Sequence, residues 1–252
     1  MRCSKEYFFL LIGFVLSTGL PKVYSQEEEP KHVFRAISLD EPISDLALVN
    51  EAEVTDFFVP SHRRSTVMTV DSQQGLRFVE SGSVVPEAGV SALPTLLQVP
   101  VAENLANPLY IFYPNPESGP APYGVFPIED NHNRFTGGMS LFINLSPYPM
   151  VLLLGDQSDE RIELNPLQKH LHEFEEDSVN VRLRIATYAS DSVQKGMDTR
   201  VFPVPTHRDI YFIYPVGGDG PGLVRMRLLR EHGNAAKRAY VVEEEEATPS
   251  SE

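Results

Sequence analysis

Residues 137–166 read GGMSLFINLSPYPMVLLLGDQSDERIELNP and contain three short apolar runs separated by two turns. The first run, residues 139–145, ends before Pro147 and Pro149, because proline lacks the N–H that a central strand donates to its neighbour. The second run, residues 150–154, precedes a turn that contains glycine and aspartate. No run approaches the roughly ten residues that a helix needs. The stretch therefore predicts a meander of three strands whose central strand is buried.

Short apolar runs separated by turns extend over most of the chain. Between residues 33 and 79, turn signals recur about every eight to twelve residues, a spacing typical of all-β sandwiches. Residues 179–187 show the clearest alternation, with branched apolar side chains on one face and mainly polar ones on the other. These patterns predict an all-β protein built as an antiparallel β-sandwich.

Two pairs of segments resemble each other at an offset of about 100 residues. The sequence LYIFYP at residues 109–114 resembles IYFIYP at residues 210–215, and each precedes a loop rich in glycine and proline. The sequence LALVN at residues 46–50 resembles LFIN at residues 141–144, and an apolar run follows each. Their common order favours an internal repeat.

Two domain arrangements are compatible with these patterns. In the first, two tandem related β-sandwich domains cover residues 33–128 and 137–232, with a polar linker at residues 129–136. Against it, VPSHR at residues 59–63 resembles VPTHR at residues 204–208 in a register that this alignment does not allow. The alternative is one large sandwich, since all-β domains of about 200 residues are common.

The first 25 residues have the parts of a secretory signal peptide. Arg2 and Lys5 form a basic start, and residues 7–16 are apolar. The third and first positions before Gln26 hold residues that a signal peptidase accepts. The apolar part is shorter than the roughly 20 residues of a membrane-spanning helix. We therefore expect cleavage before Gln26, export to the periplasm or the cell exterior, and no transmembrane segment in the mature chain. An uncleaved anchor is the alternative.

Charge and cysteine content narrow the class of protein further. The net charge is −14, and it becomes −16 without the predicted signal peptide, which carries three basic residues and one acidic residue. Such a chain is not expected to bind nucleic acid. Residues 26–32 form an acidic lead-in, and residues 233–252 are predicted to be a disordered acidic tail.

The only cysteine, Cys3, lies in the predicted signal peptide, which excludes disulfides in the mature chain and favours a bacterial cell envelope.

His170 and His172 form a candidate metal-binding pair. Residues two apart on a strand share a face, so their imidazoles can bind one metal ion if a neighbouring strand supplies a third ligand. The alternation directs Glu173 to the opposite face. The sequence favours the alternative interpretation, in which both histidines belong to a polar outward face opposite Leu171.

Four arginines form a candidate site for an anion or an anionic glycan. Arg182 and Arg184 share one face of a predicted strand, and Arg225 and Arg227 share one face of the last strand. If the two strands are neighbours, four guanidinium groups lie on one surface and can bind carboxylates or sulfates in a bidentate manner. Cross-strand pairing with nearby acids is the alternative.

The chain lacks the sequence motifs of common catalytic sites, including the Gly-x-Ser-x-Gly nucleophile elbow. We therefore predict a non-catalytic binding or assembly module of the bacterial cell envelope, without a cofactor. Its expected partner is an envelope protein or an anionic polysaccharide. One alternative is an enzyme acting on envelope glycans, with Glu160 and Glu163 as paired acids. Another is a periplasmic metal-binding protein.

Overall fold

The computed structural model describes residues 31–70, 75–115, 119–131, 134–157, 160–175, 178–189, 192–215 and 224–233. The predicted signal peptide, most of the acidic lead-in and most of the acidic tail lie outside these residues.

In the described residues, sixteen strands and one short 3₁₀ helix (Val90–Ala92) are present. The N-terminal strand set consists of β1 (His32–Ser38), β2 (Ile43–Asn50), β3 (Glu53–Val59), β4 (Met68–Val70), β5 (Leu76–Glu80), β6 (Leu97–Val99), β7 (Pro108–Pro114) and β8 (Tyr123–Glu129). The C-terminal strand set consists of β9 (Met139–Asn144), β10 (Met150–Leu154), β11 (Glu160–Leu164), β12 (Lys169–Glu173), β13 (Val181–Ala189), β14 (Ser192–Val201), β15 (His207–Pro215) and β16 (Val224–His232).

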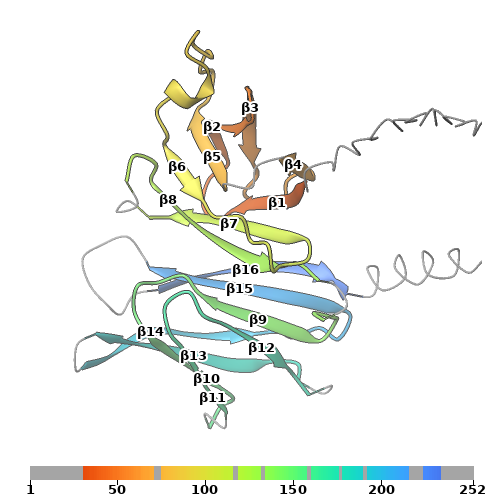
Figure 1. The fold of residues 1–252 in the computed structure, drawn as a ribbon. Helices are drawn as coiled ribbons and strands as arrows, with labels where there is room; N and C mark the ends of the chain where they lie inside the picture. Colours follow the sequence, from red (N-terminus) through yellow and green to blue (C-terminus); the bar gives the residue numbers. More distant parts are fainter. Residues whose placement is uncertain are drawn as a thin grey trace, which may run out of the picture.

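These strands form four sheets of four strands each (Figure 1). The N-terminal set contributes the sheets β4-β1-β7-β8 and β3-β2-β5-β6, and the C-terminal set contributes β12-β9-β15-β16 and β11-β10-β13-β14. The architecture is therefore all-β and sandwich-like, as predicted. Most pairs are antiparallel, but β1 pairs with β7 and β9 pairs with β15 in parallel.

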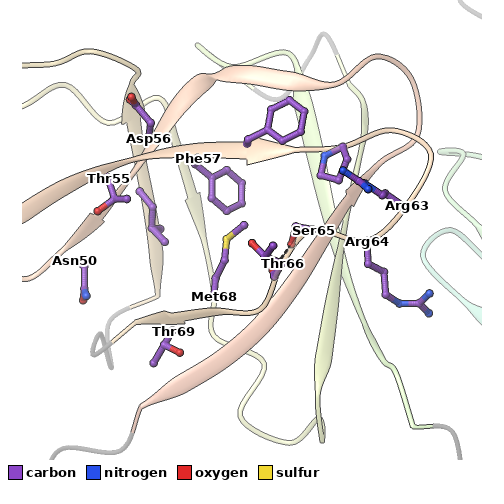
Figure 2. A pocket seen from close by; sticks show the side chains of 13 residues that line it. Asn50, Thr55, Asp56, Phe57, Arg63, Arg64, Ser65, Thr66, Met68 and Thr69 are labelled. Carbon is purple, nitrogen blue, oxygen red and sulfur yellow. Dashed lines mark hydrogen bonds between the residues drawn. The ribbon is translucent and has the colours of Figure 1, made fainter. Parts of the chain in front are cut away.

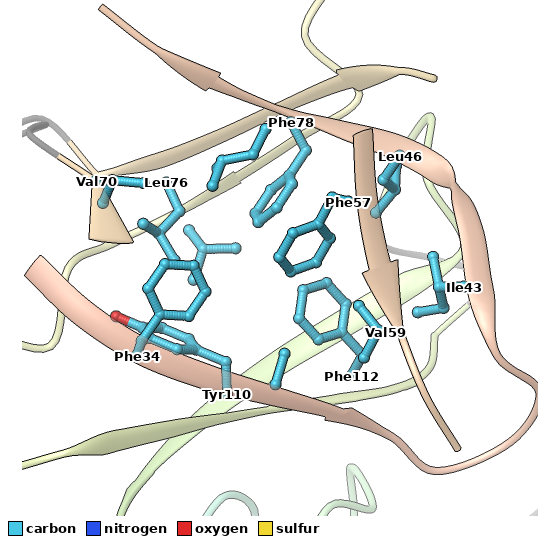
Figure 3. Packing of buried hydrophobic residues seen from close by; sticks show 13 residues of the cluster. Phe34, Ile43, Leu46, Phe57, Val59, Val70, Leu76, Phe78, Tyr110 and Phe112 are labelled. Atoms are coloured by element: carbon cyan, nitrogen blue, oxygen red, sulfur yellow. The ribbon is translucent and has the colours of Figure 1, made fainter. Parts of the chain in front are cut away.

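Three apolar clusters separate the four sheets. The first lies between the two N-terminal sheets, where Phe57 packs against Phe78 with ring centroids 4.8 Å apart (Figure 3). The second lies between the two C-terminal sheets and includes Leu152 and Tyr211. The third lies between β1-β7-β8 and β9-β15-β16 and includes Ile111. The two inner sheets are therefore covered on both faces.

Burial on both faces explains why residues 109–113 and 210–214 are continuously apolar. In β7, Tyr110 and Phe112 face the first cluster, while Leu109 and Ile111 face the third. Strand β15 divides its side chains in the same way between the second and third clusters. A strand with two buried faces reads as a continuous apolar run instead of an alternating one.

The predicted meander at residues 137–166 is confirmed in its strands but wrong in its pairing. Strands β9, β10 and β11 occupy the three runs, and β10 is buried between β11 and β13. However, β9 belongs to the other sheet, so the Pro147 and Pro149 turn carries the chain from one sheet to the next. Asn144 holds this turn, donating to the carbonyls of Tyr148 at 2.9 Å and Leu164 at 3.0 Å.

The two strand sets have the same strand order. Adding eight to each strand number of β4-β1-β7-β8 and β3-β2-β5-β6 reproduces the two C-terminal sheets, including the parallel pair. The resemblance of residues 109–114 to residues 210–215 matches β7 with β15 and agrees with this order. The resemblance of residues 46–50 to residues 141–144 does not, because it matches β2 with β9.

Candidate functional site

On one side of each strand set, an edge strand of one sheet lies close to an edge strand of the other sheet. Strands β3 and β4 are edges of the two N-terminal sheets, and β11 and β12 hold the equivalent positions in the C-terminal sheets. Edge strands present backbone groups that a sheet interior would pair. These two open sides contain the candidate sites.

A groove with a volume of about 610 Å³ lies along β3 and the segment leading into β4 (Figure 2). Its apolar lining includes Leu48, Phe57, Phe58 and Met68. Phe57 is buried in the first cluster, and Met68 packs against that cluster from the other side. Phe58 is 54% exposed, so its ring is accessible to a ligand.

The ends of the groove have opposite charges. In Figure 2, Asp56 and Arg63 lie toward opposite ends of the lining. Asp56 accepts a hydrogen bond of 2.7 Å from the Ser81 hydroxyl, which fixes the acidic end. Ser65 fixes the other wall, because its hydroxyl accepts a hydrogen bond of 2.9 Å from the Ala36 amide. The groove is therefore built by residues whose positions are set by neighbouring strands.

The second open side brings three possible metal ligands together. Glu160 on β11 and His170 and His172 on β12 have ligand atoms that all lie within 4.8 Å of one another. The Nδ1 atom of His172 is 3.1 Å from a Glu160 carboxylate oxygen. The third ligand that the sequence left undefined is thus Glu160, which comes from the other sheet.

The orientation of β12 differs from the one that the sequence favours. His170 pairs with Phe142, which faces the second cluster, so both histidines point toward the opposite sheet. Leu171 pairs with Leu141, so it lies on the opposite face of β12, where it is 43% exposed. The prediction of outward histidines opposite Leu171 is therefore wrong.

The surroundings of His172 lower the pKa of its imidazole. Burial is the largest cause, the Glu160 carboxylate opposes it, and the neighbouring His170 lowers the pKa further. The ring of Phe174 packs edge-on against His172, with centroids 4.3 Å apart. A lowered pKa favours the neutral imidazole at neutral pH.

The structure separates the four arginines of the predicted anion site. Arg182 and Arg184 lie on β13, whereas Arg225 and Arg227 lie on β16 in the other sheet. Because β13 and β16 are not neighbours, the four guanidinium groups do not share one surface. Arg182 instead makes a bidentate pair with Asp198, at 3.0 and 2.8 Å.

Arg227 contacts the N-terminal strand set. Its guanidinium donates to the backbone carbonyls of Leu39 and Ser61 and to that of Ser38 at 3.4 Å. Arg225, two residues earlier, is exposed. The two arginines of β16 therefore differ in their surroundings, and Arg227 stabilises the contact between the two strand sets.

Glu160 and Glu163 are not arranged as a catalytic pair. They are three residues apart on β11 and therefore lie on opposite faces of the strand. Glu160 faces His172, while Glu163 accepts a hydrogen bond of 2.7 Å from Arg161.

A buried ion network that the sequence does not predict joins the two strand sets. Arg208 is fully buried and lies 3.1 Å from Asp130 and 2.6 Å from Glu231. Arg64 also contacts both acids, at 2.6 Å from Asp130. The sequence predicts a polar linker at residues 129–136, but Asp130 and Phe135 in this segment are both buried. The repeated His-Arg at residues 62–63 and 207–208 was only a partial signal, because the network contains Arg208 and Arg64 but not the exposed Arg63.

Comparisons with known proteins give no family for this chain. No protein-family model matches it, and no curated protein matches it significantly. Among the described residues, no helix is long and apolar enough to span a membrane.

Proposed function

We propose that this chain is an exported, non-catalytic binding module of the bacterial cell envelope, and that it binds an extended segment of a partner protein along β3. The groove between β3 and β4 is the observation that carries this proposal. Export and the bacterial envelope rest on the signal-peptide pattern of residues 1–25 and on the absence of cysteine after Cys3.

The form of the groove favours an extended polypeptide. An edge strand can hydrogen-bond to an added strand, and side-chain pockets then select alternate residues of the ligand. The seven residues of β3 (Glu53–Val59) span about 24 Å at roughly 3.4 Å per residue, which suits a peptide of similar length. The volume of about 610 Å³ also falls within the usual range of ligand sites.

The lining indicates the chemistry of the partner. Phe58 and Met68 offer apolar contacts, so the peptide should carry branched apolar residues at alternate positions. Arg63 at one end favours an acidic residue at the corresponding end of the peptide. An anionic polysaccharide lacks the backbone amides that would pair with β3.

Two tandem related β-sandwich domains, with their boundary at residues 129–136, are the second part of the proposal. The identical strand order of the two sets supports it. The buried Asp130 within the boundary indicates that the two units pack together instead of moving independently.

A blocked heptapeptide of alternating valine and threonine with a terminal aspartate tests the binding site. We expect it to slow amide hydrogen exchange in β3 of the mature chain, and we expect Phe58→Asp to weaken its binding at least tenfold. Phe202→Asp is a matched control, because Phe202 is 53% exposed and lies outside the groove lining. Unchanged exchange in β3, or equal effects of the two substitutions, would contradict the proposal. Protection by an alginate oligomer in place of the peptide would favour a polysaccharide partner.

A further inference from the structure

The open side of the C-terminal strand set differs in chemistry from the groove of the N-terminal set. Strands β11 and β12 hold the positions that β3 and β4 hold in the other set. In place of an apolar lining, one carboxylate and two imidazoles converge there, all within 4.8 Å. This cluster is independent of the proposed peptide site.

We propose that Glu160, His170 and His172 bind one transition-metal ion of the zinc class, with water in the fourth position. Two imidazole nitrogens and one glutamate oxygen form a known zinc ligand set. Imidazole ligands suit zinc, copper and nickel, whereas calcium and magnesium prefer ligand sets made of oxygen. The donor set therefore selects the class of ion.

The ligand atoms of the three side chains need to move only slightly to bind one metal ion. Metal–ligand bonds of about 2.0–2.1 Å in a tetrahedral site place the ligand atoms roughly 3.3 Å from one another. The His172 nitrogen and the Glu160 oxygen are already 3.1 Å apart. The remaining separations do not exceed 4.8 Å. Rotation of the exposed Glu160 side chain can shorten its distance to His170, and rotation of the His170 ring can shorten the distance between the two imidazoles.

The position of His170 distinguishes this site from a simple ion pair. A hydrogen bond between Glu160 and His172 needs no second histidine, yet the His170 ring lies stacked beside the His172 ring, with centroids 6.4 Å apart. Both rings project from the same face of β12 toward β11. A metal ion between them would convert this side of the sandwich from two separate edges into one bridged unit.

The bridge would join the two C-terminal sheets. Glu160 belongs to β11-β10-β13-β14, and both histidines belong to β12-β9-β15-β16. An ion that binds the folded chain and not the unfolded chain stabilises the folded state by mass action. The ion is thus expected to raise the thermal midpoint of the mature chain and to close the side that remains open in the N-terminal set.

Zinc binding to the mature chain, residues 26–252, tests this site. The protein is prepared without a polyhistidine tag, treated with a chelator, dialysed and titrated with zinc chloride in a calorimeter. We expect one zinc ion per chain, a raised thermal midpoint that excess chelator reverses, and no comparable binding of magnesium or calcium.

Single substitutions locate the bound ion. Glu160→Gln, His170→Gln and His172→Gln should each weaken zinc binding by at least the roughly 10–100-fold that follows loss of a supporting residue around a metal. Glu163→Gln, on the outer face of the same strand, and His62→Gln, on the N-terminal set, should leave it unchanged. Equal weakening by the control substitutions would overturn the assignment.

A measurement on the unsubstituted chain covers the case in which a variant does not fold. One equivalent of zinc should shift the ring proton resonances of His170 and His172 in the NMR spectrum, with smaller effects on the other histidines. Absence of stoichiometric zinc binding, or shifts confined to other histidines, would overturn the proposal.

Discussion

Asp130 and Arg208 lie 3.1 Å apart, and both are almost inaccessible to solvent, although Asp130 belongs to the connection between the strand sets and Arg208 is the second residue of β15. Arg64 and Glu231 complete a network of two cations and two carboxylates. A buried charge is tolerated when it is paired and hydrogen-bonded. This network therefore ties the N-terminal strand set to the C-terminal one.

Replacing Arg208 with leucine should destabilise the protein by about 3–5 kcal/mol, because it leaves Asp130 and Glu231 buried or half-buried with one cation fewer. Urea unfolding monitored by circular dichroism measures this change. Arg225→Leu, at an exposed position of β16, is the control and should change stability by less than about 0.5 kcal/mol. Equal effects of the two substitutions would show that the network has no special role.

Replacing Asn144 with alanine should destabilise the turn between β9 and β10. The amide of Asn144 donates to the carbonyls of Tyr148 and Leu164, and its carbonyl accepts from the Ser146 amide at 2.9 Å. Loss of a fully buried partner leaves these groups unsatisfied, at a cost of about 1–3 kcal/mol. Thermal unfolding of Asn144→Ala measures the loss, and Asn165→Ala at an exposed position should have little effect. Equal midpoints for the two variants would contradict this account.

Tyr211 should make stability depend on pH in the alkaline range. Burial and the neighbouring Asp209 carboxylate raise the pKa of this phenol above its ordinary value of 10.0. Its contribution is fully present below about pH 10 and is lost as the pH rises, because the unfolded chain then releases the proton while the folded chain retains it. Tyr211→Phe should therefore reduce the fall in unfolding free energy between pH 8 and 11. An unchanged fall in this variant would assign the effect to other groups.

The carboxyl of Asp198 should titrate well below its ordinary range. Hydrogen bonding to Arg182 is the largest cause, and it lowers the pKa of Asp198 from 3.8 to about 2. The favourable interaction is present above about pH 4 and is lost as the pH falls through about 2. An NMR titration of the side-chain carboxyl carbon measures this value, and Arg182→Gln should raise it toward 3.8. Failure of the variant to raise it would show that Arg182 is not the main partner in solution.

The positions of the strands could be predicted because their signals are local. Prolines at 147 and 149 end one strand, and the alternation at residues 179–187 identifies a strand with one buried face. The pairing of β9 could not be predicted in the same way, since its neighbours β12 and β15 lie far along the chain. A run of apolar residues shows that a strand is buried without showing which sheet contains it.

In the candidate sites too, local features could be predicted from the sequence, and contacts between sheets could not. The spacing of His170 and His172 was sufficient to place both imidazoles on one face of a strand. The third member of the cluster, Glu160, lies near the histidines only because two sheets pack together. The residues next to it in the sequence do not indicate this contact. The same reason explains the separation of Arg182 from Arg227, which alternate correctly on their own strands but belong to different sheets.

By itself, the sequence determined that the chain is all-β, where most strands begin and end, and which side chains of an alternating strand share a face, because these properties follow from local backbone geometry and the two-residue period of a strand. Only the tertiary structure decided the four-sheet order, the inward direction of His170 and His172, and the burial of Arg208. These depend on contacts between residues distant in sequence, whose free energies are realised only when the sheets pack together.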